Sequence, residues 1–462
     1  MATTVMPQRN QVKDDEIVLD GVFNGEENED EVEEALRGMC VEANPEEEEN
    51  SNDYVDISDD IGIEDKHHEK LSAERSGFRK MAGKSLRGLW NSAKKLAGRS
   101  KDRMKDSDVE RLLEKVMKCR HKLAHPNGGL INTDYEGIKV SRSVVAEVVK
   151  QMGRKLLSGQ NLLSVTFPVR CCQPRTILEC AAYQFCFCPH YLSRAAMETD
   201  PVERLKHVTA CFIACIHTTS QFVKPFNPTL GETLQASFDG GVRLYLEQTS
   251  HHPPVTSWQV VGPNNSFQYI GWSTYEASFG YNKLYVKQSG IRMCQFPDGT
   301  TIEVGFTMDR YNNVYWGDVI QEVLGGYTFL DTKNSISCTI ELNPCKGLPS
   351  DTFIGSINRL DAQGEIINSI CNVEGSFLGF LDFNGHRYWD ISSNTGRDPV
   401  FDPLEKCLPS DSRFREDRNA LVNGEVERAQ VEKVRIEERQ RRERRLRAAA
   451  AKGGPWIPAD VK

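Results

Sequence analysis

The stretch EQTSHHPPVTS, residues 247–257, places two adjacent histidines directly before two prolines. The residues just before it, VRLYLEQ at 242–248, alternate apolar and polar side chains, as a half-buried strand does. Proline fixes φ and cannot donate to a sheet ladder, so we expect the strand to end near Pro253. His251 and His252 would then stand on a rigid strand end, where both rings can donate hydrogen bonds to an anion. This arrangement favours phosphate binding over catalysis.

A second block, KPFNPTLGET at residues 224–233, carries another candidate pair. Taken alone, Lys224 and Asn227 would be a surface lysine and a turn asparagine. The prolines at 225 and 228 fix an extended backbone, however, so a lysine between them loses little freedom when it binds an anion. We therefore add both residues to the candidate site.

Together the two blocks resemble the fingerprint of the oxysterol-binding protein-related family. The resemblance extends from about Val149 to about Arg445, and Thr249 is a mild departure from the family's usual valine. It implies an α+β fold: a large incomplete antiparallel β-barrel enclosing a lipid tunnel, with an N-terminal lid, helical layers and a long C-terminal helix. It also implies that the protein is a lipid carrier and not an enzyme.

The resemblance assigns roles to the candidate residues. His251, His252 and Lys224 match the positions that bind the 4-phosphate of phosphatidylinositol 4-phosphate in the family, and Asn227 matches one that binds the inositol. The charge-rich segment 425–452 reads as one long helix, and three of its residues share one face at i, i+4 and i+8. In the family a lysine, glutamate and arginine at this spacing complete the head-group site, here Lys433, Glu437 and Arg441. The alternative is a solvated helix held by intrahelical ion pairs.

A short amphipathic segment, residues 144–157, matches the family's lid over the tunnel. Its expected apolar face consists of Val145, Val148, Val149, Met152 and Leu156. We place the lid at about 144–165, at the start of a lipid-binding domain that spans 144–450. A helical entry segment, 107–143, precedes this domain, and a tail, 451–462, follows it.

The chain has 462 residues and a formal charge of −9, which is unevenly distributed. Residues 1–65 contain 22 acidic and three basic side chains, so the rest of the chain carries a net charge of +10. We expect 1–70 to be a disordered acidic tail. Within it, Asn52–Asp60 loosely resembles an acidic motif, centred on Tyr54, that attaches lipid-transfer proteins to endoplasmic-reticulum receptors; a solvated acidic tail is the alternative.

The segment 71–106 is basic, and its apolar residues recur at helical spacing between Phe78 and Leu96. Such a helix can lie in a membrane interface and favours anionic lipid. An ordinary surface helix packed on the domain explains the pattern equally well. Further along, residues 174–221 read as helices and 233–373 as many short strands separated by turns, which indicates an antiparallel meander.

Other classes of function find little support. No G-x-S-x-G elbow, H-E-x-x-H motif or P-loop lysine is present. The set Cys180, Cys186, Cys188 and His190 lacks the C-x2-C turn of common zinc sites, so we expect no metal and no cofactor. The 14 cysteines, without an apolar leader or a transmembrane run, indicate reduced thiols in the cytosol.

The sequence thus predicts a cytoplasmic protein, peripheral on endoplasmic reticulum, Golgi or plasma-membrane contacts. It would bind phosphatidylinositol 4-phosphate and a second lipid, a sterol by preference or phosphatidylserine, in one tunnel and exchange them between membranes. The alternative is a lipid-dependent sensor or scaffold that moves little lipid. A nucleic-acid binder is the third class, and the scarcity of aromatics near the basic runs argues against it.

Overall fold

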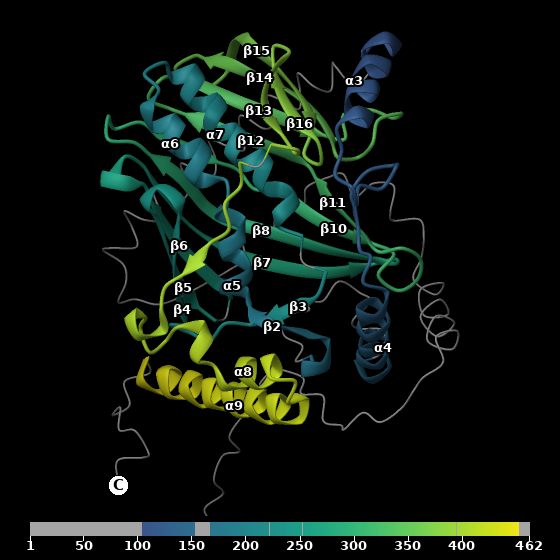
Figure 1. The fold of residues 1–462 in the computed structure, drawn as a ribbon, viewed down its shortest axis with the longest axis vertical. Helices are drawn as coiled ribbons and strands as arrows, with labels where there is room; N and C mark the ends of the chain where they lie inside the picture. Colours follow the sequence, from purple (N-terminus) through teal and green to yellow (C-terminus); the bar gives the residue numbers. More distant parts are fainter. Residues whose placement is uncertain (1–103, 153–166, 221, 252, 394, 452–462) are drawn as a thin grey trace, which may run out of the picture.

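The computed structural model describes residues 104–152, 167–220, 222–251, 253–393 and 395–451. Its centre is a 16-stranded sheet, which follows an open path from β17 through β16, β15, β14, β13, β12, β9, β8, β7, β6, β5 and β4 to β18 (Figure 1). Strands β10, β11 and β1 branch from β8. This agrees with the expected α+β fold and antiparallel barrel-like sheet.

The strands of the large sheet pair antiparallel throughout. Their bounds are β1 Leu130–Ile131, β4 Thr233–Phe238, β5 Val242–Ser250, β6 Val255–Val261, β7 Gln268–Gly280, β8 Lys283–Gln295, β9 Thr301–Val304, β10 Met308–Asn312, β11 Ile320–Leu324, β12 Gly326–Asp331, β13 Ile336–Leu342, β14 Thr352–Leu360, β15 Ile366–Ser376, β16 Phe380–Phe383, β17 His386–Asp390 and β18 Val400–Phe401. A separate parallel pair joins β2 Cys172–Thr176 to β3 Lys224–Phe226.

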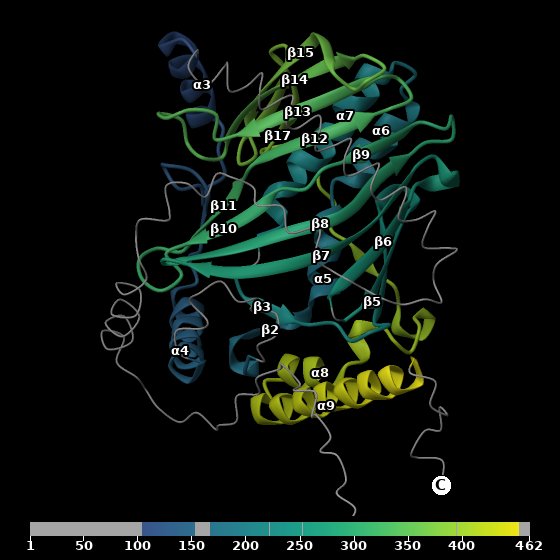
Figure 2. The same cartoon turned by 180° about the vertical axis from the view of Figure 1, so that it is seen from behind.

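Alternating side chains fix which face of each strand looks inward. In β4 and β5 every second residue is buried, as the pattern of the VRLYLEQ stretch predicts. Strand β5 ends at Ser250, three residues before Pro253, in agreement with the expected proline stop. Strands β7 and β8 have 13 residues each and form the long wall seen from behind in Figure 2.

Two helices pack with the sheet to form the main core. These are α6 (Cys188–Met197) and α7 (Pro201–Cys215), and α7 contacts β12, β13 and β17. Helix α7 begins where the side chain of Asp200 accepts the Val202 N–H, with proline in its first turn. Its residues from Val208 to Cys215 are buried on all sides, so the helix is part of the main core. A short helix, α5 (Ile177–Ala182), completes the predicted helical region.

The C-terminal helix forms a layer below the strand ends, next to β2 and β3. Helix α9 spans Val426–Ala451 and packs with α8 (Glu416–Val422), which contacts β2 (Figure 1). The expected single long helix at 425–452 is therefore present.

Of the two N-terminal helices, α4 begins earlier than the sequence indicated. Helix α3 covers Asp106–Lys118 and has no side-chain cap. It packs Leu112 and Val116 against Phe380. Helix α4 spans Tyr135–Met152 and so begins nine residues before the segment predicted at 144.

Helix α4 passes through the boundary that we placed between the entry segment and the lipid-binding domain. Ile138 and Val144 are buried on the body of the protein, and that packing outweighs the low helix propensity of Gly137. The acidic tail 1–70 with its Asn52–Asp60 motif, the basic segment 71–106 up to residue 103, and the tail from 452 lie outside the described residues.

Candidate functional site

A cavity of about 780 Å³ lies inside the curved sheet and reaches α9. Segments from both ends of the chain line it, including α4, β2, β3, β5 to β8, β10 and α9. Six of the seven residues predicted for the head-group site lie on its wall: Lys224, Asn227, His251, Lys433, Glu437 and Arg441. The seventh, His252, lies outside the described residues.

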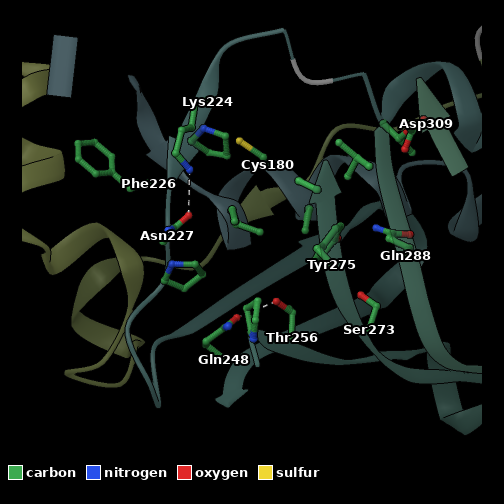
Figure 3. A pocket seen from close by; sticks show the side chains of 18 of the residues that line it. Cys180, Lys224, Phe226, Asn227, Gln248, Thr256, Ser273, Tyr275, Gln288 and Asp309 are labelled. Atoms are coloured by element: carbon green, nitrogen blue, oxygen red, sulfur yellow. Dashed lines mark hydrogen bonds between the residues drawn. The ribbon is translucent and has the colours of Figure 1, made fainter. Parts of the chain in front are cut away.

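The KPFNP block forms one side of the cavity mouth. Lys224 opens β3, and its Nζ donates to Asn227 Oδ1 at 3.2 Å (Figure 3). The same ammonium lies 5.7 Å from the centre of the Phe167 ring. Phe226, between the two polar residues in sequence, is 2% exposed and anchors the block in a small core. The prolines and this anchor hold the lysine and the asparagine side by side.

The end of β5 forms a second side. His251 follows Ser250 in a turn and lines the cavity. Gln248, just before it, is buried: its Nε2 donates to Ser250 O at 2.8 Å, and its Oε1 accepts from Thr256 Oγ1 at 2.7 Å. These bonds join the strand that leads into the histidine turn to β6, which leads out of it. They hold the two strands on either side of the histidine turn in a fixed position.

Helix α9 supplies the third side. Lys433 is only 8% exposed, and its Nζ pairs with Glu437 Oε1. The second oxygen of Glu437 lies 3.8 Å from Arg441 Nη2. The carboxylate thus stands between two cations on one helix face, as the i, i+4, i+8 spacing predicted. Ammonium and guanidinium groups can bind phosphate oxygens, while the carboxylate can accept from sugar hydroxyls.

Sequence reasoning missed a central residue of the mouth, Arg415. Its Nη1 donates to the backbone oxygen of Asn227 at 2.6 Å and to Glu232 Oε2 at 3.0 Å. Its Nη2 donates to Asp417 Oδ2 at 2.6 Å, and its guanidinium lies 5.4 Å from the centre of the Phe226 ring. Nothing in the local sequence marks Arg415, because its partners lie up to 188 residues away.

Four more residues on the α9 face line the cavity: Gln440, Glu443, Arg444 and Arg447. Arg444 and Arg447 follow Arg441 at steps of three residues, so extending the helical spacing by two turns would have found these two arginines. The mouth is therefore more cationic than the sequence analysis indicated.

The interior of the cavity carries a polar band on a largely apolar wall, which also includes Arg292. Ser273, Tyr275, Gln288 and Asp309 all line it (Figure 3). Gln321 Nε2 donates to Asp309 Oδ1 at 2.7 Å, and burial raises the pKa of the Asp309 carboxyl to about 6. No sequence pattern indicates this band, since single polar residues on alternating strands resemble exposed ones.

The structure describes only part of the predicted lid. Val145 lies on α4, lines the cavity and packs beside buried residues such as Val169. Val148, Val149 and Met152 lie on the same helix, but their side chains, like Leu156 altogether, fall outside the described part.

Within the described ranges, no cluster of three or more histidine, cysteine or acidic side chains could hold a metal ion. No helix in those ranges is both long and apolar enough to cross a bilayer.

The family model described as oxysterol-binding protein matches residues 149–388 and 387–459 of this chain. The chain belongs to the oxysterol-binding protein family. Oxysterol-binding protein 9 of Dictyostelium discoideum is 31% identical over 346 residues, which cover 71% of this chain and 81% of that protein. Oxysterol-binding protein-related protein 6 of Mus musculus is 29% identical over 324 residues, or 62% of this chain and 32% of the mouse protein. The chain thus spans about a third of that longer relative.

Solved structures of the family share this fold. The ORD domain of Osh1 in complex with cholesterol superposes with a TM-score of 0.56 at 20% identity, over 75% of this chain and 88% of that one. The ORD of Osh3 from Saccharomyces cerevisiae, in complex with PI(4)P, gives 0.54 at 21% identity, over 71% and 88%. The predicted fold is confirmed, and the chain is a lipid-binding member of a family of lipid-transfer proteins and not an enzyme.

Proposed function

We propose that this oxysterol-binding protein family member extracts phosphatidylinositol 4-phosphate and exchanges it for a second lipid, a sterol, between two membranes. The observation that supports this most is the junction of two environments in one cavity. An interior with a largely apolar wall opens onto a mouth where Lys224, His251, Lys433 and Arg441 meet from three distant segments. An amphipathic lipid needs both environments.

The energetics of transfer fit such a cavity. A buried methylene gains about 0.8 kcal/mol relative to water, so a 16-carbon chain needs a dry cavity that replaces nearly all its bilayer contacts. The phosphate must in turn exchange its hydration for several charge-assisted hydrogen bonds. We assign the phosphate to His251, His252, Lys224, Lys433 and Arg441, and the inositol hydroxyls to Asn227 and Glu437.

Sterol is the preferred second lipid for a physical reason. The polar band around Asp309 offers hydrogen-bond partners deep in the cavity, where a lone sterol hydroxyl would otherwise be unsatisfied. The Osh1 ORD structure holds cholesterol, which supports the choice by analogy of fold.

Membrane contact follows from charge. The basic segment 71–106 and the cationic mouth favour anionic membrane surfaces at contact sites, and Asn52–Asp60 would attach the protein to a receptor on the endoplasmic reticulum. Both proposals place the protein in the cytoplasm, peripheral on membranes, and neither involves nucleic acid.

Transfer between two liposome populations tests the proposal. Donor liposomes contain fluorescently tagged phosphatidylinositol 4-phosphate, and acceptors contain sterol, phosphatidylserine or neither. We expect transfer that sterol acceptors accelerate at least fivefold, and its loss in the His251→Ala, His252→Ala double variant, with unchanged melting temperature. Binding without transfer would favour the lipid sensor or scaffold instead, and normal extraction by the double variant would refute the head-group assignment.

A further inference from the structure

Two adjacent thiols stand at the mouth of the cavity. Cys171 ends a short 3-10 turn, Val169–Cys171, and Cys172 begins β2; both line the cavity. Their sulfurs lie 3.0 and 3.8 Å from the same carbonyl oxygen, that of Pro168. The two thiols therefore occupy one small region of the wall. Cys172 is only 9% exposed, so a reagent reaches it through the cavity and not from the outer surface.

Two cations of the mouth line the same wall of the cavity as this pair. Cys172 lies opposite Lys224 in the parallel pairing of β2 with β3, and Lys433 contributes to the same wall. The pKa of the Cys172 thiol is lowered to about 7, because the neighbouring Cys171 thiol and the two ammonium groups favour the thiolate against the opposing effect of burial. A thiolate fraction at neutral pH makes Cys172 a nucleophile.

The other thiols on the same wall differ from Cys172 in the direction or the cause of their pKa shifts. Burial raises the pKa of Cys180 to about 12, and burial also raises that of Cys188. The pKa of Cys215 is lowered, but through hydrogen bonds donated by the thiols of Cys186 and Cys211, with no lysine among its causes. Cys180 is thus a matched control for Cys172, and Cys215 is the competitor.

We propose that Cys172 is a covalent capture site for electrophilic lipids, namely long-chain α,β-unsaturated aldehydes that enter the cavity tail first. The aliphatic chain would occupy the apolar interior, which leaves the aldehyde end among the thiols and lysines of the mouth. This inference rests on the proposed function, because it takes the cavity to be a lipid site.

The chemistry is a conjugate addition and needs no oxidant. The Cys172 thiolate adds to the β-carbon, a carbon–sulfur bond forms, and the π electrons of the double bond move onto the carbonyl as an enolate. The α-carbon then takes a proton from water or from the Cys171 thiol, which is reprotonated from solvent. Overall, the S–H bond adds across the double bond, and the adduct blocks the place that the phosphate would take.

The test uses the full chain and trans-2-hexadecenal at low excess, with borohydride to fix the adducts and peptide mass spectrometry to locate them. We expect Cys172 to be modified at least tenfold faster than Cys180. Lys433→Met should slow the reaction, and raising the pH should restore its rate. Cys180→Ser should leave the adduct unchanged, while Cys172→Ser should abolish it. Equal labelling of all thiols, or labelling mainly at Cys215, would overturn the proposal.

Protection separates this inference from the proposed function. Protein loaded with phosphatidylinositol 4-phosphate should form the adduct at least tenfold more slowly than empty protein. If the protein binds this phosphoinositide and the adduct forms at the same rate, the mouth location of the capture site is wrong. If it binds no phosphoinositide, yet Cys172 reacts selectively, the proposed ligand fails while the capture site stands.

Discussion

At the scale of single residues, buried ion pairs hold the residues of the cavity mouth in position. Arg415 is the clearest example, because it joins the backbone of Asn227 to two buried carboxylates, Glu232 and Asp417. The contacts of Glu232 are those of a structural residue, because its carboxylate accepts from Arg415, Ser412 and Thr229. The head-group residues can be exposed to a ligand because residues such as Arg415 hold their backbone in place.

We expect Arg415→Ala to lower the free energy of unfolding by about 3–5 kcal/mol, because it leaves two buried carboxylates without their cation. Urea denaturation measures this change. Arg428→Ala is the control: Arg428 is 60% exposed and pairs with Glu425, so its removal should cost less than about 1 kcal/mol. An Arg415 variant as stable as the control would show that these ion pairs do not stabilise the fold.

The raised pKa of Asp309 predicts a pH-dependent stability. Its folded-state pKa of about 6 lies above the ordinary value of 3.8, so the folded protein prefers the neutral acid. The ionised form therefore destabilises the fold above pH 6, and the penalty disappears as the pH falls from 6 towards 4. Asp309→Asn should be more stable than wild type by about 3 kcal/mol at pH 7.5.

Denaturation at a series of pH values checks this expectation. The difference between Asp309→Asn and wild type should shrink below pH 6 and nearly vanish at pH 4. A difference that is constant with pH would mean that Asp309 is not the titrating group.

At the scale of elements, α9 contributes by one face. Arg441 and Arg439 are two residues apart, and both lie near a glutamate of the same helix. Only Arg441 lines the cavity, however, and its side chain is 18% exposed against 59% for Arg439. The helix thus offers two arginine substitutions for comparison, one at a position that lines the cavity and one at a position that does not.

We expect Arg441→Ala to weaken phosphatidylinositol 4-phosphate binding by about tenfold to a hundredfold, because it removes a charge-assisted hydrogen bond of about 1.5–3 kcal/mol. Arg439→Ala should change binding less than twofold. Titration with liposomes of fixed composition measures both. Equal losses in the two variants would indicate a general charge effect of the helix, and not a site.

Periodicity predicted most elements, and tertiary packing explains the misses. The alternation in β5 and the helical spacing in α9 both reflect one buried face, and this is what a sequence pattern records. The start of α4 was missed because Gly137 hides the pattern, while Ile138 gains its burial from distant segments. Arg415 and the polar band were missed for a related reason, since their partners are brought together only by the fold.

The motif residues could be predicted because the information that marks them is local in the sequence. The histidine turn and the KPFNP block each combine a functional side chain with prolines that fix the local backbone, so their chemistry can be read locally. The convergence of these two blocks with the α9 triad on one cavity could not be read from spacing, because more than 180 residues separate β5 from Lys433. It came from the resemblance and agrees with the structure.

At the scale of the whole molecule, the binding domain and the N-terminal segment should separate. Helix α3 packs Leu112 and Val116 on the body of the protein, so a truncation must keep it. Removing residues 1–103 should preserve phosphoinositide binding in detergent micelles within twofold. It should also weaken sedimentation with anionic liposomes severalfold, because the basic segment is lost.

The control is a shorter truncation, of residues 1–70, which removes the acidic tail and keeps the basic segment. It should leave liposome sedimentation equal or stronger. Loss of ligand binding in micelles on removing 1–103 would show instead that the N-terminal segment belongs to the lipid site.

The central claim is that one cavity accepts either of two lipids, with the phosphate at its mouth. Native mass spectrometry of the protein equilibrated with phosphatidylinositol 4-phosphate and cholesterol together tests it most directly. We expect two bound species, each carrying a single lipid, whose ratio follows the ratio of the lipids supplied. A species that carries both lipids at once, or a protein that retains neither, would contradict the account.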